Sequence, residues 1–188
     1  MRAVALAGLG ALALPVLGLL ALLVVVAGVL GGGSLGGGST PAGAPGRPPA
    51  WVVALDATVA SAPTSEASCA VPAPLLEAQQ EVESGWTPSA RSAAGAEGIA
   101  QFLPPTFAEY AHPVPPGGAS PPSPWDPADA AWAEARYLCS LGIDRTVRAA
   151  LIAYNCGSDS VVCQLASAGY AREIERLALA LAARGAAP

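Results

Sequence analysis

An uncharged apolar run near the N-terminus limits how this chain can fold more than any other feature. Residues 3–30 carry no charged side chain, and Arg2 is the only positive residue before them. A bilayer core needs about 20 apolar helical residues, so the run is long enough to span it. It predicts a transmembrane or signal helix over residues 1–30 and leaves only the later residues for a folded domain.

Two interpretations of residues 1–30 remain open. An uncleaved anchor would keep its N-terminus inside, because positive flanks such as Arg2 stay in the cytoplasm. A cleavable signal peptide would be cut near small residues such as Ala27 and Gly28, although its apolar core is typically only about 7–15 residues. Both interpretations export everything that follows.

Glycine, serine and proline dominate the next stretch, from GGGSLGGGST to PAGAPGRPPA. Such sequences behave as flexible or extended spacers. The following WVVAL, residues 51–55, is β-prone and is expected to be a strand-like approach segment or disordered. We therefore assign residues 31–66 to a flexible linker and residues 67–188 to one domain.

The domain has a helical pattern and no convincing strand. One helix is expected after Pro72 and Pro74, ending by Gly85, and a second from the Asp126-Pro127 cap to Gly142. A third spans about 145–155, a short fourth starts at Ser158 or Asp159, and a last helix carries Ile174, Leu177 and Leu181 and ends at Gly185. Residues 104–124 form a Pro/Gly/Ser-rich loop that is either a lid over a cleft or disordered.

Charge and cysteine content exclude several function classes. The formal net charge is −5 and no basic cluster exists, which argues against a nucleic-acid partner. His112 is the only histidine and no CxxC pair occurs, so neither a metal site nor a histidine-dependent triad is expected. An even number of cysteines in an exported chain favours disulfides, and four cysteines permit three pairings.

The stretch ESGWTPSARSAAGAEGIAQFLPPTF, residues 83–107, carries the most chemical information. Glu83 stands at the C-terminal end of an apolar-faced helix and is followed by small residues that allow close backbone approach. A carboxyl between apolar walls, near the negative end of a helix dipole, keeps its proton to higher pH. Such a group can act as a general acid near neutrality.

This stretch resembles the soluble lytic transglycosylase family, which is related in fold to goose-type lysozyme. The family pattern is E-S-x-[FW]-x-P-x-A-x-S-x-x-G-A-x-G-[LI]-x-Q-[FI]-x-P-x-T, followed later by A-Y-N-x-G. The chain matches it at Glu83, Ser84, Trp86, Pro88, Ala90, Ser92, Gly95, Ala96, Gly98, Ile99, Gln101, Phe102, Pro104, Thr106 and 153–157. The resemblance covers roughly residues 69–180 and implies a mostly α, lysozyme-like helical domain behind the N-terminal helix and linker.

The resemblance also implies roles for individual residues. Glu83 matches the single catalytic acid/base, and Ser92 matches a residue that orients its carboxyl. The remaining substrate-binding positions are Gln101, Leu103, Tyr154 and Asn155. Leu103 stands where methionine is common, and GIAQ replaces the usual GLMQ.

Exported relatives often pair a cysteine before the catalytic helix with one in a Y-x-C position, which implies Cys69 with Cys139 and leaves Cys156 with Cys163. The implied partner is peptidoglycan, with no cofactor, at the bacterial cell membrane with the domain extracytoplasmic, or secreted after cleavage. The membrane would be reached through residues 1–30, and cell-wall or secretion machinery is a further possible partner.

Three functions remain open from the sequence. The first is a lytic transglycosylase that cleaves the bond between N-acetylmuramic acid and N-acetylglucosamine and forms 1,6-anhydro ends. The second is a muramidase that uses water on the same scaffold, although no second well-placed acidic residue flanks the motif. The third is a non-catalytic wall-binding module of a secretion or conjugation apparatus.

Overall fold

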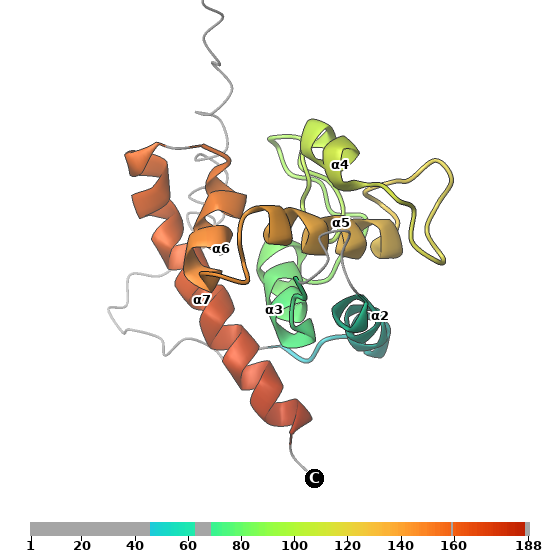
Figure 1. Ribbon diagram of the computed structural model, residues 1–188, viewed down its shortest axis with the longest axis horizontal. Coiled ribbons are helices and arrows are strands. Elements are labelled where there is room, and N and C mark those ends of the chain that lie inside the picture. The colour runs from blue at the N-terminus through green and yellow to red at the C-terminus, as the bar shows by residue number, and fades with distance from the viewer. Residues whose placement is uncertain (1–45, 63–68, 159, 187–188) are drawn as a thin grey trace, which may run out of the picture.

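The computed structural model describes residues 46–62, 69–158 and 160–186. Figure 1 shows a helical domain with the long α7 along one side and the short α4 on the other. The helices are α2 (Ala50–Ser61), α3 (Ala73–Ser84), α4 (Pro104–Tyr110), α5 (Pro127–Ser140), α6 (Val147–Cys156) and α7 (Val161–Gly185). Within these ranges no strand forms, and the mostly α prediction is confirmed there.

The predicted N-terminal helix and most of the linker lie outside the described residues. Among the helices that are described, none is long and apolar enough to cross a membrane.

Helix α3 lies at the centre of the domain and packs against α2, α5 and α7. Pro74 stands in its first turn, where its missing N–H costs nothing, and Gly85 ends it with a left-handed φ of 61°. Leu75, Leu76 and Ala78 are buried in the main core. The predicted helix between Pro72 and Gly85 is therefore confirmed.

Helix α5 begins and ends where the sequence predicts. The Asp126 side chain accepts hydrogen bonds from the backbone N–H groups of Ala128 and Asp129, and Pro127 is the first helical residue. Several of its buried residues are alanines, and their small side chains let neighbouring elements approach the α5 backbone closely.

Two predictions about helix boundaries in the C-terminal half have different outcomes. The third helix is confirmed as α6, although it starts at Val147. The separate short helix after Ser158 is wrong, because a single α7 runs from Val161 to Gly185 with Ser160 as its cap. Gly169 lies in the interior of α7, where a glycine costs only about 1 kcal/mol relative to alanine, so the helix continues through it.

The segment that begins with WVVAL is neither a strand nor disordered, which corrects the prediction. Residues 50–61 form α2, and Val52, Asp56 and Val59 are buried at 0%, 0% and 2% exposure. Their spacings of four and three place them on one helical face against α3 and α5. Burial of that face overrides the local β-propensity, so these residues belong to the folded domain and not to the linker over 31–66.

The loop predicted over residues 104–124 is ordered in the structure, which corrects the interpretation as disorder. Its first seven residues form α4, whose Phe107 is buried. Beyond α4, the Asp129 carboxylate accepts hydrogen bonds from the N–H groups of Ala119 and Ser123 at 3.0 and 2.9 Å. Arg136 donates to the carbonyls of Tyr110 and Pro113. Two charged side chains of α5 thus hold this proline-rich chain in place.

The disulfide between Cys69 and Cys139 joins the segment before α3 to the end of α5, with a Cα–Cα distance of 5.9 Å. A second disulfide joins Cys156 to Cys163. Both agree with the pairing that the family resemblance implies.

A buried polar cluster connects three helices. The Gln80 amide of α3 donates to Asp56 of α2 and to Glu134 of α5, at 3.2 and 2.9 Å. Both carboxyls have 0% exposure. Burial raises the pKa of Asp56 to about 7 and holds the pKa of Glu134 well above its usual range. The domain therefore folds around carboxyl groups that are neutral at mildly acidic pH.

We predict that the domain is more stable at pH 5 than at pH 7.5. In the unfolded chain Asp56 ionises near pH 3.8, whereas in the fold its pKa is about 7. Between these values the unfolded state binds fewer protons, so the free energy of unfolding falls as pH rises. Asp56→Asn should reduce the fall between pH 5 and 7 by about 2 kcal/mol in urea unfolding. Exposed Asp144→Asn is the control, and an unchanged pH dependence in Asp56→Asn would contradict a neutral Asp56.

We also predict that Asp129→Ala destabilises the domain by about 2–3 kcal/mol, because it removes a buried charged acceptor from two N–H groups. Urea unfolding measures the loss, and limited proteolysis should cut first between residues 111 and 126. Glu109→Gln, on the exposed side of α4, should cause neither effect.

Candidate active site

Glu83 lies in the last turn of α3 and is half-buried. Its Oε1 accepts a hydrogen bond of 2.5 Å from the hydroxyl of Tyr170, which comes from α7. Its Oε2 accepts no hydrogen bond from the described residues. This oxygen is not fully buried, so solvent can reach it. One carboxyl oxygen is thus held by the protein while the other remains available.

The environment of Glu83 favours a protonated carboxyl. Burial raises the pKa of Glu83 to about 7, and the hydrogen bond from Tyr170 opposes part of that rise. A hydrogen bond to the charged form stabilises the carboxylate, whereas loss of solvent destabilises it. A pKa near the operating pH lets one group donate a proton and take one back.

The turn-rich segment after Glu83 folds back on itself. The Ser84 hydroxyl donates to the Ile99 carbonyl at 2.8 Å, which joins the end of α3 to the far side of the segment. Gly98 has a φ of +80°, and a Cβ there would lie 1.8 Å from the Pro124 carbonyl oxygen. Only glycine fits this approach, so the segment also contacts the loop that precedes α5.

Two residues of this segment adopt left-handed backbone conformations without being glycine. Trp86 has a φ of 57° and Gln101 a φ of 49°. The Trp86 indole N–H donates to the Glu77 carbonyl at 2.8 Å, which fixes the ring against α3. Such conformations are uncommon for bulky residues and cluster at functional sites.

Ser92 and Gln101 brace the backbone of the segment. The Ser92 hydroxyl accepts a hydrogen bond from the Ala96 N–H, and the Gln101 amide donates to the carbonyls of Ala90 and Gly98. Neither side chain hydrogen-bonds to Glu83 within the part of the chain that is described. Leu103, the residue before α4, is 43% exposed.

Tyr154 and Asn155 lie in the last turn of α6. The Tyr154 hydroxyl donates to the Ala100 carbonyl at 2.9 Å, and the Asn155 amide donates to the Ser167 hydroxyl at 2.9 Å. Burial, followed by the nearby Glu134 and Glu83, raises the pKa of Tyr154 well above its usual value. Tyr154 therefore stays a neutral donor beside the carboxyl of Glu83.

Tyr170 is a site residue that the sequence analysis missed. It lies four residues before Ile174, on the same helical face as the predicted core positions of α7, so the spacing contained a signal. Burial and the neighbouring Glu83 raise its pKa well above the usual value, so its hydroxyl keeps its proton.

Glu134 is a second carboxyl close to Glu83 that the sequence analysis also missed. Burial raises its pKa most, followed by the charge of Asp56, and the charge of Glu83 adds a smaller increase. It comes from the middle of α5 and is fully buried, so it supports the site from inside without reaching solvent. Across residues 46–62, 69–158 and 160–186, no three His, Cys, Asp or Glu side chains gather as a possible metal site.

The sequence of this domain matches a known family. A family model described as the transglycosylase SLT domain matches residues 64–176, more than half of the 188 residues. No curated protein and no solved structure matches the chain. The matched range includes Glu83, Tyr154 and Tyr170. The chain therefore belongs to the SLT transglycosylase family, whose lysozyme-like domains act on peptidoglycan.

Proposed function

We propose that this protein is a peptidoglycan lytic transglycosylase with Glu83 as its single general acid/base. It cleaves the β-1,4 bond between N-acetylmuramic acid and N-acetylglucosamine and leaves a 1,6-anhydro end. The observation that carries the proposal is the half-buried Glu83 carboxyl, with a pKa of about 7 and one oxygen held by Tyr170.

The reaction needs one group that first gives and then takes a proton. Protonated Glu83 donates its proton to the glycosidic oxygen as the bond from that oxygen to the muramic C1 breaks. The 6-hydroxyl oxygen of the same muramic residue then bonds to C1, and its proton returns to Glu83. No water is consumed, and the carboxyl ends in its starting state.

The neighbours of Glu83 have supporting parts in this scheme. Tyr170 keeps one carboxyl oxygen occupied, so that the proton is exchanged at the other oxygen. Glu134, Tyr154 and Tyr170 stay neutral, so the carboxylate formed after proton donation faces dipoles and not further negative charge. The substrate's own N-acetyl group stabilises the reaction centre, as the family resemblance implies, which removes the need for a second ionised carboxylate.

We place the domain outside the cytoplasm. Two disulfides within a small domain suit an oxidising compartment, and the glycan strands of the wall lie there. The apolar run over residues 3–30 would serve as a membrane anchor or as an export signal.

We predict that Glu83→Gln lowers the rate of peptidoglycan clearing by about 10²–10⁴-fold, because the amide has no acidic proton to donate. Turbidity loss of purified walls measures the rate, and the thermal midpoint checks that the variant is folded. Glu109→Gln is the matched control and should keep the wild-type rate. Equal clearing by wild type and Glu83→Gln would show that Glu83 is not the acid.

Mass spectrometry of the released fragments distinguishes a lytic transglycosylase from a muramidase. Anhydro ends support the transglycosylase, and reducing ends identify a muramidase. A folded chain that binds walls but releases no fragments would identify a binding module.

We further predict that Tyr170→Phe lowers the rate about tenfold and moves its alkaline limb to higher pH. The hydrogen bond from Tyr170 lowers the pKa of Glu83, so its loss lets that pKa rise above about 7. Because the acid must be protonated, the rate then declines at a higher pH than in wild type. A pH–rate profile measures the shift, and a limb that stays in place would rule out this role for Tyr170.

A further inference from the structure

The first three turns of α7 touch the rest of the domain mainly through one face. Cys163, Ser167 and Tyr170 are buried or half-buried, and their spacings of four and three place them on one side of the helix. The large apolar side chains of the same turns are 68%, 69% and 73% exposed: Val161, Val162 and Leu165. These turns therefore gain little from hydrophobic packing.

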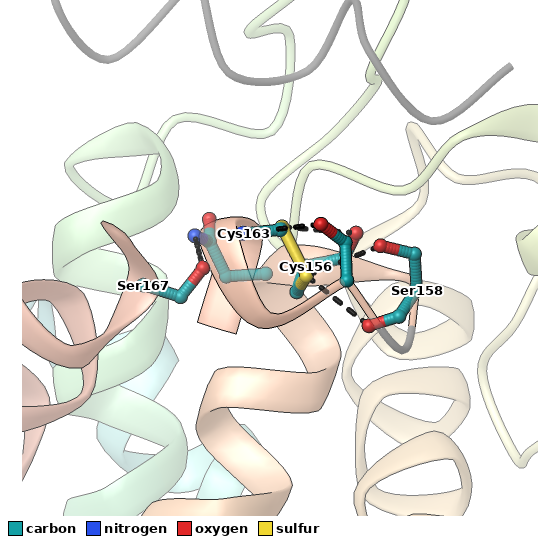
Figure 2. Close-up of a disulfide and its surroundings, with 6 residues drawn as sticks. Cys156, Ser158, Cys163 and Ser167 are labelled. Carbon is teal, nitrogen blue, oxygen red and sulfur yellow. Dashed lines mark hydrogen bonds between the residues drawn. A yellow bond between two sulfur atoms is a disulfide. The ribbon is translucent and has the colours of Figure 1, made fainter. Parts of the chain in front are cut away.

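Each residue of this face makes one specific bond to a neighbouring helix. Cys163 is disulfide-bonded to Cys156 of α6, and Ser167 accepts the hydrogen bond from Asn155 of α6. Figure 2 shows the disulfide and Ser167 further along α7. Tyr170 then donates to Glu83 of α3. The disulfide, the hydrogen bond from Asn155 to Ser167 and the hydrogen bond from Tyr170 to Glu83 thus follow one another along a single face.

The N-terminal cap of α7 is weak. The Ser160 cap accepts from the Cys163 N–H at a long 3.5 Å. Gly169, directly before Tyr170, lowers the helix propensity of the same turns. A covalent bond that closes a short loop limits the freedom of such a segment, in the unfolded chain and during local opening.

We propose that the Cys156–Cys163 disulfide is a positioning element for the catalytic acid. By tying the first turn of α7 to the end of α6, it keeps Tyr170 in register to donate to Glu83. This inference rests on the function proposed above. It adds that the disulfide holds Tyr170 in position at the same site.

Loss of the disulfide would act on Glu83 through Tyr170. The groups that face the Glu83 carboxyl are Tyr170 of α7, Tyr154 of α6 and Glu134 of α5. Tyr154 lies two residues before Cys156, but its hydroxyl is held separately by its hydrogen bond to the Ala100 carbonyl, whereas Tyr170 depends on the position of α7, whose first turn the disulfide ties to α6. Fraying of the first turns of α7 would remove its hydroxyl and leave the other two in place, so the pKa of Glu83 would rise.

The test compares four forms of the full chain: wild type, Cys156→Ser/Cys163→Ser, Tyr170→Phe and the triple variant. The disulfide variant should lose about tenfold in rate and show the same alkaline shift of the pH–rate limb as Tyr170→Phe. The triple variant should be no worse than either parent, because both changes break one interaction. A disulfide variant with the wild-type profile, or effects that multiply, would overturn the proposal.

A second readout does not depend on catalysis. Carbon-13 NMR titration of the Glu83 carboxyl should show a higher pKa in the disulfide variant than in wild type. The triple variant, which adds Tyr170→Phe, should show no further increase. If wild type shows no cleavage, the proposed function fails while this titration still decides the role of the disulfide. Val162→Thr, in the same exposed turns, should leave the Glu83 pKa and the rate unchanged.

If the disulfide variant does not melt cooperatively, Ser167→Ala replaces it. That variant removes the middle bond of the face without touching a cysteine. It should shift the pKa of Glu83 in the same direction by a smaller amount. No shift in a folded Ser167→Ala chain would count against positioning through this face.

Discussion

The contact between the half-buried Glu83 carboxyl and the Tyr170 hydroxyl is the interaction on which the rest of this site depends. Removal of a carboxyl from water destabilises its charged form, and a single donor compensates only in part, which leaves the pKa of Glu83 near 7. That balance requires the end of α3 and the first half of α7 to stay in fixed register. The packing of α3 and α6 against α7 provides this register, and the Cys156–Cys163 disulfide extends it to the start of α7.

Two further carboxyls, Asp56 and Glu134, are buried in the core near Glu83, and their burial is unfavourable. Gln80 bridges Asp56 and Glu134, so three helices meet around two buried carboxyls whose pKa values are raised. An apolar core of the same volume would be expected to be more stable, since buried polar groups must lose their hydration. At mildly acidic pH the arrangement leaves the interior next to Glu83 polar but largely uncharged. The stability of the domain therefore depends on the pH at which these carboxyls ionise.

The signature segment after Glu83 works largely through its backbone. The side chains of Ser92 and Gln101 hydrogen-bond to nearby backbone N–H and carbonyl groups. Gly98 leaves room for the Pro124 carbonyl, and the Ser84 hydroxyl joins the segment to α3. Such a segment forms an ordered wall beside Glu83, the proposed catalytic acid. Backbone geometry thus accounts for several of the small and hydrogen-bonding residues of the motif.

The sequence by itself determined what depends on neighbours along the chain. Proline and aspartate at helix starts, glycine at helix ends and the spacing of apolar residues predicted α3, α5 and α6, and the motif around Glu83 led to the family. Tertiary structure decided what depends on residues distant in the chain. It made α2 a helix by burying Val52 and Val59, and it merged two expected helices into α7. It also brought Tyr170 and Glu134 to the carboxyl of Glu83. The physical reason is that burial sets both pKa values and the final choice between helix and strand, and burial is a property of the packed domain and not of local sequence.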